Sequence, residues 1–298
     1  MDKKIIIGKQ IFEHLKTREY APVSIYKGLN EFLRIGPKEI LVPELNLHKK
    51  LLNFGFPVPK ILSEGEQDGE FFYIEESMGE TLLGDELWQN YKITGKVSNE
   101  HFNILLNIAN KFSQAQLKTA TNSRDEESFF LGIHTNYLAE ELPEIKTELF
   151  AGFKTLINRT AKLPYVLTHG DFNVYNLFEK GVIDFGSNFN APAGYDIVSP
   201  LFHTYNFPNS NEYEMSRRYE FNESQKNSYL VFMDNIFSQA KLPPISEYLE
   251  DFIFAKTIWS TARMQQYPKL QKWRYIQFKN LLLKYINGES LMQVLMEN

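Results

Sequence analysis

The hydrophobic and polar positions of the chain follow one pattern before about residue 78 and another after it. In the first part, short apolar runs alternate with turn residues, which is typical of strands joined by tight turns. Residues 23–27 and 31–35 predict a hairpin that turns at residues 28–30. Two further strands are predicted at residues 60–63 and 70–75.

One helix is predicted inside this first part. Apolar residues recur from Glu44 to Leu52, directly after Pro43. Gly55 follows the last of them, and a glycine just past the last apolar position is a common signal for the end of a helix. The first part is therefore predicted to be rich in strands with one helix between them.

The second part is dominated by longer amphipathic patterns. Ser98 is placed to cap a helix in which apolar residues recur at helical spacing, and a second helical stretch over residues 135–160 is predicted to break at Pro143. Three more helices are predicted at about 219–240, 245–267 and 269–296. Residues 165–200 are instead rich in turns and polar residues. Irregular backbone inside a helical region is where a functional site is expected.

Composition narrows the class of protein. The chain has 298 residues and a net charge of −5, so no overall positive field favours binding to nucleic acid. It has no cysteine, which excludes disulfides and thiolate metal sites. The apolar run at residues 5–7 is too short for a secretory signal, and no apolar stretch is long enough to span a membrane. We expect a cytoplasmic protein without a membrane or nucleic-acid partner.

Candidate chemistry lies in the irregular segment. The patterns on either side of Glu179-Lys180-Gly181 predict a tight hairpin, which would place Asn176 near Asp184 across its open end. Asp171 lies in the loop that leads into the hairpin. Carboxylate and amide oxygens suit Mg²⁺, which takes few protein ligands together with phosphate oxygens. A free carboxylate nearby can accept the proton of an attacking hydroxyl, as phosphoryl transfer requires.

The order of these residues resembles a known family. His169-Gly170-Asp171, then Asn176, then Ile183-Asp184-Phe185-Gly186 is similar to the catalytic and metal-binding loops of the aminoglycoside phosphotransferase and choline-kinase-like family. Gly170, where a protein kinase has arginine, favours the small-molecule branch. The resemblance implies an α+β, bilobal, protein-kinase-like fold, with a small β-rich N-terminal lobe (residues 1–78) that binds nucleotide. A larger helical C-terminal lobe (residues 79–298) would carry the catalytic and metal-binding loops.

The resemblance also implies an activity and its residues. The chain would be a kinase that transfers the γ-phosphate of ATP to a hydroxyl of a small molecule such as an aminoglycoside, choline or another amino or sugar alcohol. Asp171 would be the base, and Asn176 and Asp184 would bind Mg²⁺. His169 and Asp196 are expected to brace the catalytic loop without reacting.

On the nucleotide side, the resemblance makes Arg34 the strand residue that meets the phosphates, paired with Glu44 of the following helix. Lys27, one strand earlier, is the alternative to Arg34. A glycine-rich phosphate loop is missing from the sequence. The backbone of the segment that connects the lobes is expected to contact adenine, and its residues are Glu75, Glu76 and Ser77.

Other interpretations stay open. The same fold could belong to a protein kinase or to a weakly active nucleotide-binding regulator, and the many aromatic residues could instead form a partner surface on a helical interaction protein. The acceptor is not identified by the sequence. Acidic residues in the later helices favour a cationic acceptor, unless they form a solvated face: Glu212, Glu214, Glu220, Glu223, Glu247, Glu250 and Asp251.

Overall fold

The computed structural model describes residues 4–19 and 21–296. The chain divides into two compact units, one made of residues up to Thr81 together with Phe178–Ile183, the other of Leu82–Leu177 and the residues from Asp184 onward. The first unit thus ends three residues beyond the boundary expected from the sequence, and it includes a short later segment that no local pattern predicted. None of the described helices is long and apolar enough to cross a membrane.

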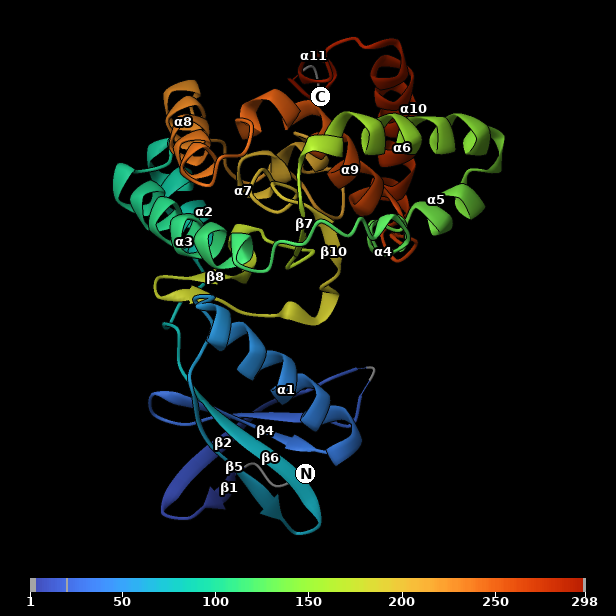
Figure 1. Ribbon diagram of the computed structural model, residues 1–298. Coiled ribbons are helices and arrows are strands. Elements are labelled where there is room, and N and C mark those ends of the chain that lie inside the picture. The colour runs from blue at the N-terminus through green and yellow to red at the C-terminus, as the bar shows by residue number, and fades with distance from the viewer. Residues whose placement is uncertain (1–3, 20, 297–298) are drawn as a thin grey trace. The chain divides into compact units, whose positions relative to one another are not determined.

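The first unit is an antiparallel sheet with one helix packed on it (Figure 1). Its strands follow the order β1-β2-β3-β4-β6-β5. They are β1 (Lys4–Ile7), β2 (Gln10–Thr17), β3 (Ser24–Lys27), β4 (Glu31–Gly36), β5 (Ile61–Gln67) and β6 (Glu70–Glu76). The predicted hairpin is β3 with β4, in which Lys27 pairs with Phe32, and the two later strands are β5 and β6.

The two faces of this sheet have different roles. One face carries an apolar cluster that includes Leu33, Ile35 and Ile74. The other face packs Tyr73 against Leu41 and Leu45 of helix α1 (Lys38–Phe54). Side chains alternate across a strand, so Arg34 lies on the face that α1 covers.

Helix α1 is longer than predicted. It begins at Lys38, so Pro43 lies inside it and does not precede it. Proline removes one helical hydrogen bond, here to the carbonyl of Glu39, which is exposed and can bond to water. The predicted end is correct: Gly55 has φ +83°, and its N–H donates to the carbonyl of Leu52.

The second unit is mainly helical, and Figure 1 shows its helices grouped around short strands. The helices are α2 (Leu83–Thr94), α3 (Asn99–Leu117), α4 (Glu126–Gly132), α5 (Thr135–Glu141), α6 (Lys146–Arg159), α7 (Ser199–Phe202), α8 (Glu223–Gln239), α9 (Leu249–Thr261), α10 (Pro268–Asn287) and α11 (Met292–Met296). Strand β7 (Tyr165–Leu167) pairs with β10 (Asn190–Pro192). Short 3₁₀ turns are η1 (Pro143–Ile145), η2 (Thr160–Lys162), η3 (Val174–Asn176), η4 (Phe185–Ser187), η5 (His203–Asn206) and η6 (Ile245–Tyr248).

Several predicted helix boundaries are confirmed. Ser98 caps α3 by accepting a hydrogen bond from the His101 N–H at 3.2 Å. The predicted break at Pro143 separates α5 from α6. The helix predicted from residue 219 begins only at Glu223, because Asn222 and Gln225 form a reciprocal capping box there. The resulting structure is α+β, with a β-rich N-terminal unit and a larger helical unit, as predicted.

Candidate active site

The residue before the predicted base has to be glycine. Gly170 has φ +84°, a backbone conformation that other residues rarely adopt, and a Cβ built on it would lie 2.1 Å from the carbonyl oxygen of Ser187. The loop after β7 and the turn η4 therefore touch through their backbones. This contact holds Asp171 at a fixed place beside the segment that carries Asp184.

Asp196 also holds the loop that carries Asp171. Its buried carboxylate accepts hydrogen bonds from the N–H of His169 at 2.7 Å, the N–H of Gly170 at 3.2 Å and the side-chain amide of Gln116 at 2.8 Å. This confirms that Asp196 braces the loop. His169 is fully buried, with its ring 4.5 Å from that of Phe185, so its expected structural role is confirmed as well.

A buried lysine that the sequence did not reveal completes this support. Lys256 of α9 donates to the carbonyl of Gly170 at 2.7 Å, and its Nζ lies 3.8 Å from Oδ1 of Asp196. The ammonium also lies 3.8 Å from the centre of the Tyr195 ring. Burial lowers the pKa of Lys256 to about 8, although Asp196 and Asp171 favour its charged form.

The carboxylate of Asp171 is held by two asparagines. Asn173 donates to Oδ1 at 2.6 Å, and Asn176 donates to Oδ2 at 3.1 Å and to the Asp171 carbonyl at 2.8 Å. Asn173 was missed in the sequence, although it lies two residues after Asp171, a spacing typical of side chains that close a turn. The carboxylate is only partly buried, so it retains lone pairs that can accept a proton.

The predicted hairpin consists of β8 (Leu177–Phe178) and β9 (Gly181–Val182); Asn176 comes directly before it, and Asp184 is the second residue after it. The turn is therefore one residue shorter than predicted. Asp184 is exposed and has φ +66°, a left-handed conformation that is unfavourable for a residue with a Cβ. A strained backbone at this position has to be maintained by its surroundings.

The donor set fits a hard cation that takes few protein ligands. Because the amide nitrogen of Asn176 is used by Asp171, its oxygen is the atom left for a metal, and Asp184 offers an exposed carboxylate. Within the described part of the chain, no three His, Cys, Asp or Glu side chains are grouped in a way that could hold a metal ion. This arrangement suits Mg²⁺ bound mainly by phosphate and water, and it does not suit a zinc site.

In the N-terminal unit, the expected pairing of Arg34 with Glu44 is wrong. Nε of Arg34 donates to Oε1 of Glu75 at 2.8 Å, and Glu44 is paired with Arg18 instead. Register explains the difference, since Glu75 and Arg34 lie on the same face of neighbouring strands β6 and β4. Although burial opposes the charge, Glu75 raises the pKa of Arg34 above its ordinary value. Lys27 lies on the same face but is exposed.

The segment expected to meet adenine is partly committed to other contacts. The N–H of Glu76 donates to the Lys60 carbonyl at 2.9 Å, and the N–H of Ser77 donates to the Asn30 carbonyl at 2.8 Å. The side chain of Glu75 is buried with Arg34. The amide hydrogens of Glu76 and Ser77 are therefore used inside the unit. This leaves fewer hydrogen-bonding groups on this segment for adenine.

The acidic residues that favoured a cationic acceptor mostly have structural partners. Glu214 accepts from the N–H groups of Lys269 and Leu270 at the start of α10, and Asp251 is buried against Tyr285. Glu220 and Glu223 lie beside Lys226, and Glu250 accepts from Ser290. These contacts account for five of the seven carboxylates without a ligand, so those five no longer favour a cationic acceptor.

Comparison with known proteins identifies the family of the chain. The model of the phosphotransferase enzyme family matches residues 32–225, which is more than half of the chain and includes the whole catalytic loop and hairpin. The chain belongs to the phosphotransferase enzyme family. The predicted family and enzyme class are thereby confirmed: the protein is an ATP-dependent phosphotransferase.

One solved structure of low sequence identity shows the same fold. This family member is similar to a choline/ethanolamine kinase family protein from Mesorhizobium loti, with 13% identity, a TM-score of 0.53, and coverage of 96% of this chain and 92% of that one. Aminoglycoside phosphotransferase APH(3'')-Id from Streptomyces rimosus, solved with ADP and streptomycin, matches with 14% identity, a TM-score of 0.46, and coverage of 80% and 91%. No curated protein matches the sequence significantly.

Proposed function

We propose that the chain transfers the γ-phosphoryl group of ATP to a hydroxyl of a small molecule. Asp171 is the general base, and Asn176 and Asp184 are the ligands of Mg²⁺. The observation that carries this proposal is the hydrogen bond from the Asn176 amide to the Asp171 carboxylate at 3.1 Å. One asparagine thereby orients the base with its nitrogen and is left with its oxygen for the metal.

The reaction follows from these roles. The acceptor's hydroxyl oxygen forms a bond to the γ-phosphorus while the bond from that phosphorus to the oxygen bridging to the β-phosphate breaks. ADP leaves with the electron pair of the broken bond, and the hydroxyl proton passes to the Asp171 carboxylate. Bound Mg²⁺ would neutralise negative charge on the phosphate oxygens. Asn173 and Asn176 keep the carboxylate of Asp171 in one orientation during the transfer.

The N-terminal unit supplies the nucleotide contacts in this proposal. Arg34, oriented by Glu75, meets the phosphates, and Glu44 contributes by holding Arg18. The carbonyl oxygens of Glu76 and Ser77 accept from the amino group of adenine, since their amide hydrogens already have partners. Arginine is suited to phosphate because its planar fork offers several donors at once.

The experiment that tests the proposal begins with a panel of amino- and hydroxy-metabolites and follows ADP formation by the purified chain. In Asp171→Asn, kcat should fall by ~10²–10⁴, the usual contribution of a general base, while the KM for ATP changes little. In Asp184→Ala, magnesium should no longer promote protection of the protein by ATP against thermal unfolding. Near-normal turnover in the first variant, or unchanged magnesium dependence in the second, would refute these roles.

A further inference from the structure

Both polar groups of the peptide that joins Gly170 to Asp171 are held by buried side chains. Its carbonyl accepts a hydrogen bond from Nζ of Lys256 at 2.7 Å, and its N–H donates to Nδ1 of His169 at 3.2 Å. This peptide is the main-chain link that leads directly into the proposed base. Lys256 therefore holds the chain at the residue before Asp171.

The glycine at this position makes such a contact necessary. Gly170 has φ +84°, and glycine populates positive and negative φ about equally because it has no Cβ. Gly170 itself therefore does not select one orientation for the peptides on its two sides. Contacts from surrounding residues have to select it.

An ion pair spans Gly170 and holds both of these peptides. Oδ1 of Asp196 accepts from the Gly170 N–H at 3.2 Å, and Nζ of Lys256 donates to the Gly170 carbonyl. The two charged atoms, Oδ1 and Nζ, lie 3.8 Å apart. The carboxylate thus fixes the peptide before Gly170, and the ammonium fixes the peptide after it.

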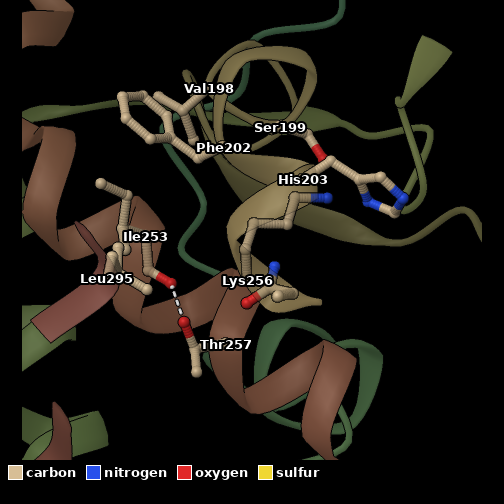
Figure 2. Close-up of a pocket in the computed structure, with 9 residues that line it drawn as sticks. Val198, Ser199, Phe202, His203, Ile253, Lys256, Thr257 and Leu295 are labelled. Atoms are coloured by element: carbon tan, nitrogen blue, oxygen red, sulfur yellow. Dashed lines mark hydrogen bonds between the residues drawn. The ribbon is translucent and has the colours of Figure 1, made fainter. Parts of the chain in front are cut away.

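The surroundings of Lys256 keep its ammonium in place. The residue is 6% exposed, and its Nζ lies 3.8 Å from the centre of the Tyr195 ring and 5.5 Å from that of the Trp259 ring. Figure 2 shows the Lys256 side chain extending from α9 towards the segment that carries Ser199. A hydrogen bond with a charged donor is stronger than one between neutral groups, so the bond to Gly170 is a strong constraint on the loop.

The asparagines beside the base hold a different part of it. Asn173 and Asn176 donate to the Asp171 carboxylate, whereas Lys256 donates to the peptide that precedes Asp171. Loss of Lys256 leaves the partners of the carboxylate in place and releases the chain before it. A displacement of ~1 Å in a reacting group can cost ~10²-fold in rate, so the effect should fall on turnover.

We propose that Lys256 is a positioning residue for phosphoryl transfer: by holding the Gly170 carbonyl, it fixes the chain that places Asp171 against the acceptor hydroxyl. This inference rests on the proposed function, because it takes Asp171 to be the base. It gives Lys256 a part in turnover that a contribution to stability alone does not require.

The first measurement separates kcat from KM. Lys256→Met keeps an unbranched side chain of similar length and removes the donor. ADP formation is followed with the metabolite that gives the highest turnover in the panel above, or with water as acceptor where no metabolite is accepted. We expect kcat to fall ~10-fold or more while the KM for ATP changes by less than about threefold. A wild-type kcat in a variant that ATP still protects against thermal unfolding overturns the proposal.

Lys226 of α8 offers a matched control. It is 3% exposed, but it donates to the Tyr205 hydroxyl at 2.6 Å and to Glu223 at 2.7 Å instead of to the catalytic loop. Lys226→Met should lower the free energy of unfolding and leave kcat within about twofold of the wild type. Equal losses of kcat in Lys226→Met and Lys256→Met would show that Lys256 acts through stability alone, which also overturns the proposal.

A double-mutant cycle tests whether Lys256 acts through the base. Once the base is removed, its position no longer matters, so Lys256→Met should change kcat by less than about threefold in the Asp171→Asn background. The same loss in both backgrounds would give Lys256 a role independent of the base and refute the proposal. If Lys256→Met does not fold, the cycle is measured with Lys256→Gln, whose neutral amide ends one atom short of the lysine nitrogen.

The proposed function fails in a different way from this inference. If the function is wrong, Asp171→Asn retains the turnover of the wild type. If only the positioning role is wrong, turnover still requires Asp171, but Lys256→Met leaves it unchanged or reduces it by the same factor in both backgrounds.

Discussion

Arg34 and Glu75 show how the environment of a single residue sets the strength of an ion pair. Their side chains are 20% and 5% exposed, so both charges are largely withdrawn from water. Removing one of them leaves the other buried without a counter-charge, which is far more costly than losing a pair on the surface. Lys38 and Glu66 in the same unit offer the comparison, since their side chains are 65% and 60% exposed.

We expect the effects of Arg34→Ala and Glu75→Ala to be strongly coupled. Each single variant should raise the KM for ATP and lower the free energy of unfolding, and the double variant should be no worse than the more damaging single one, with a coupling energy above ~1 kcal/mol. Arg34→Lys should retain a measurable part of the activity. Double-mutant cycles of urea unfolding and ATP kinetics measure both effects.

Controls for this pair come from the same unit. Lys38→Ala and Glu66→Ala should show no measurable coupling. Arg34→Ala and Glu44→Ala should be close to additive, because Glu44 is paired with Arg18. A silent Arg34→Ala together with a severe effect of Lys27→Ala would transfer the phosphate contact to Lys27.

Individual site residues differed in how well the sequence revealed them. Asp171, Asn176 and Asp184 lie within one short segment, so their order and spacing identified them as candidates. The pairing of Arg34 with Glu75 depends on the register of β4 and β6. The partner of Glu44 is Arg18, which lies between β2 and β3. No local pattern encodes either pairing. Lys256 is 86 positions from Gly170, and nothing in the helical pattern around it predicts that its side chain points to the catalytic loop.

At the scale of elements, the catalytic loop and the turn η4 depend on each other through one glycine. Gly288, which ends α10, is a useful comparison, because it also has a positive φ, +72°, but has no atom within 4 Å of the place where a Cβ would lie. A left-handed backbone costs roughly 1–2 kcal/mol for a residue with a Cβ. At Gly170 the contact with the Ser187 carbonyl is added to that cost.

Gly170→Ala should therefore do more damage than Gly288→Ala. We expect Gly288→Ala to lower the free energy of unfolding by ~1–2 kcal/mol and to leave kcat nearly unchanged. Gly170→Ala should lower the free energy of unfolding by clearly more and reduce kcat at least tenfold, because the loop has to move away from Ser187. Chemical denaturation and ADP-release assays give the two values. Equal effects of the two substitutions would show that the close contact is unimportant.

Elements were predictable where the pattern is local. The hairpin of β3 and β4, the cap of α3 and the break at Pro143 all follow from residues within a few positions of each other. The start of α1 was missed because proline usually ends a helix, whereas here the lost hydrogen bond is the one to the carbonyl of Glu39, an exposed residue. Helices α2 and α4 were missed as separate elements, because their short patterns adjoin longer ones.

At the scale of the whole molecule, Lys256 connects helix α9 to the loop that carries the proposed base, Asp171. Its charge is buried among Asp196, Asp171 and Tyr195, and its pKa in the folded protein is about 8 against an ordinary value of 10.5. Between these two pH values the unfolded chain binds the proton more strongly than the folded one. The contribution of Lys256 to the free energy of unfolding must therefore become more favourable as pH rises through this window.

The prediction is a pH-dependent difference between wild type and Lys256→Met. The wild type should gain free energy of unfolding relative to the variant as pH rises from 8 to 10.5, by at most about 1.4 kcal/mol per pH unit, the value for one proton. Urea unfolding at several pH values measures this difference. Lys38→Met, at an exposed position, should run parallel to the wild type. Parallel curves for Lys256→Met would contradict the shifted pKa.

The hairpin of β8 and β9 has a consequence for how the chain is made. Its tip belongs to the N-terminal unit, where the N–H of Val182 donates to the Pro57 carbonyl at 2.8 Å and Gly181 packs on Pro57 and Met78. The ribosome releases these residues about 100 positions after Thr81, which at ordinary elongation rates means roughly 5–20 s later. The N-terminal unit is therefore complete only after this segment has been synthesised, and the same segment is flanked by Asn176 and Asp184.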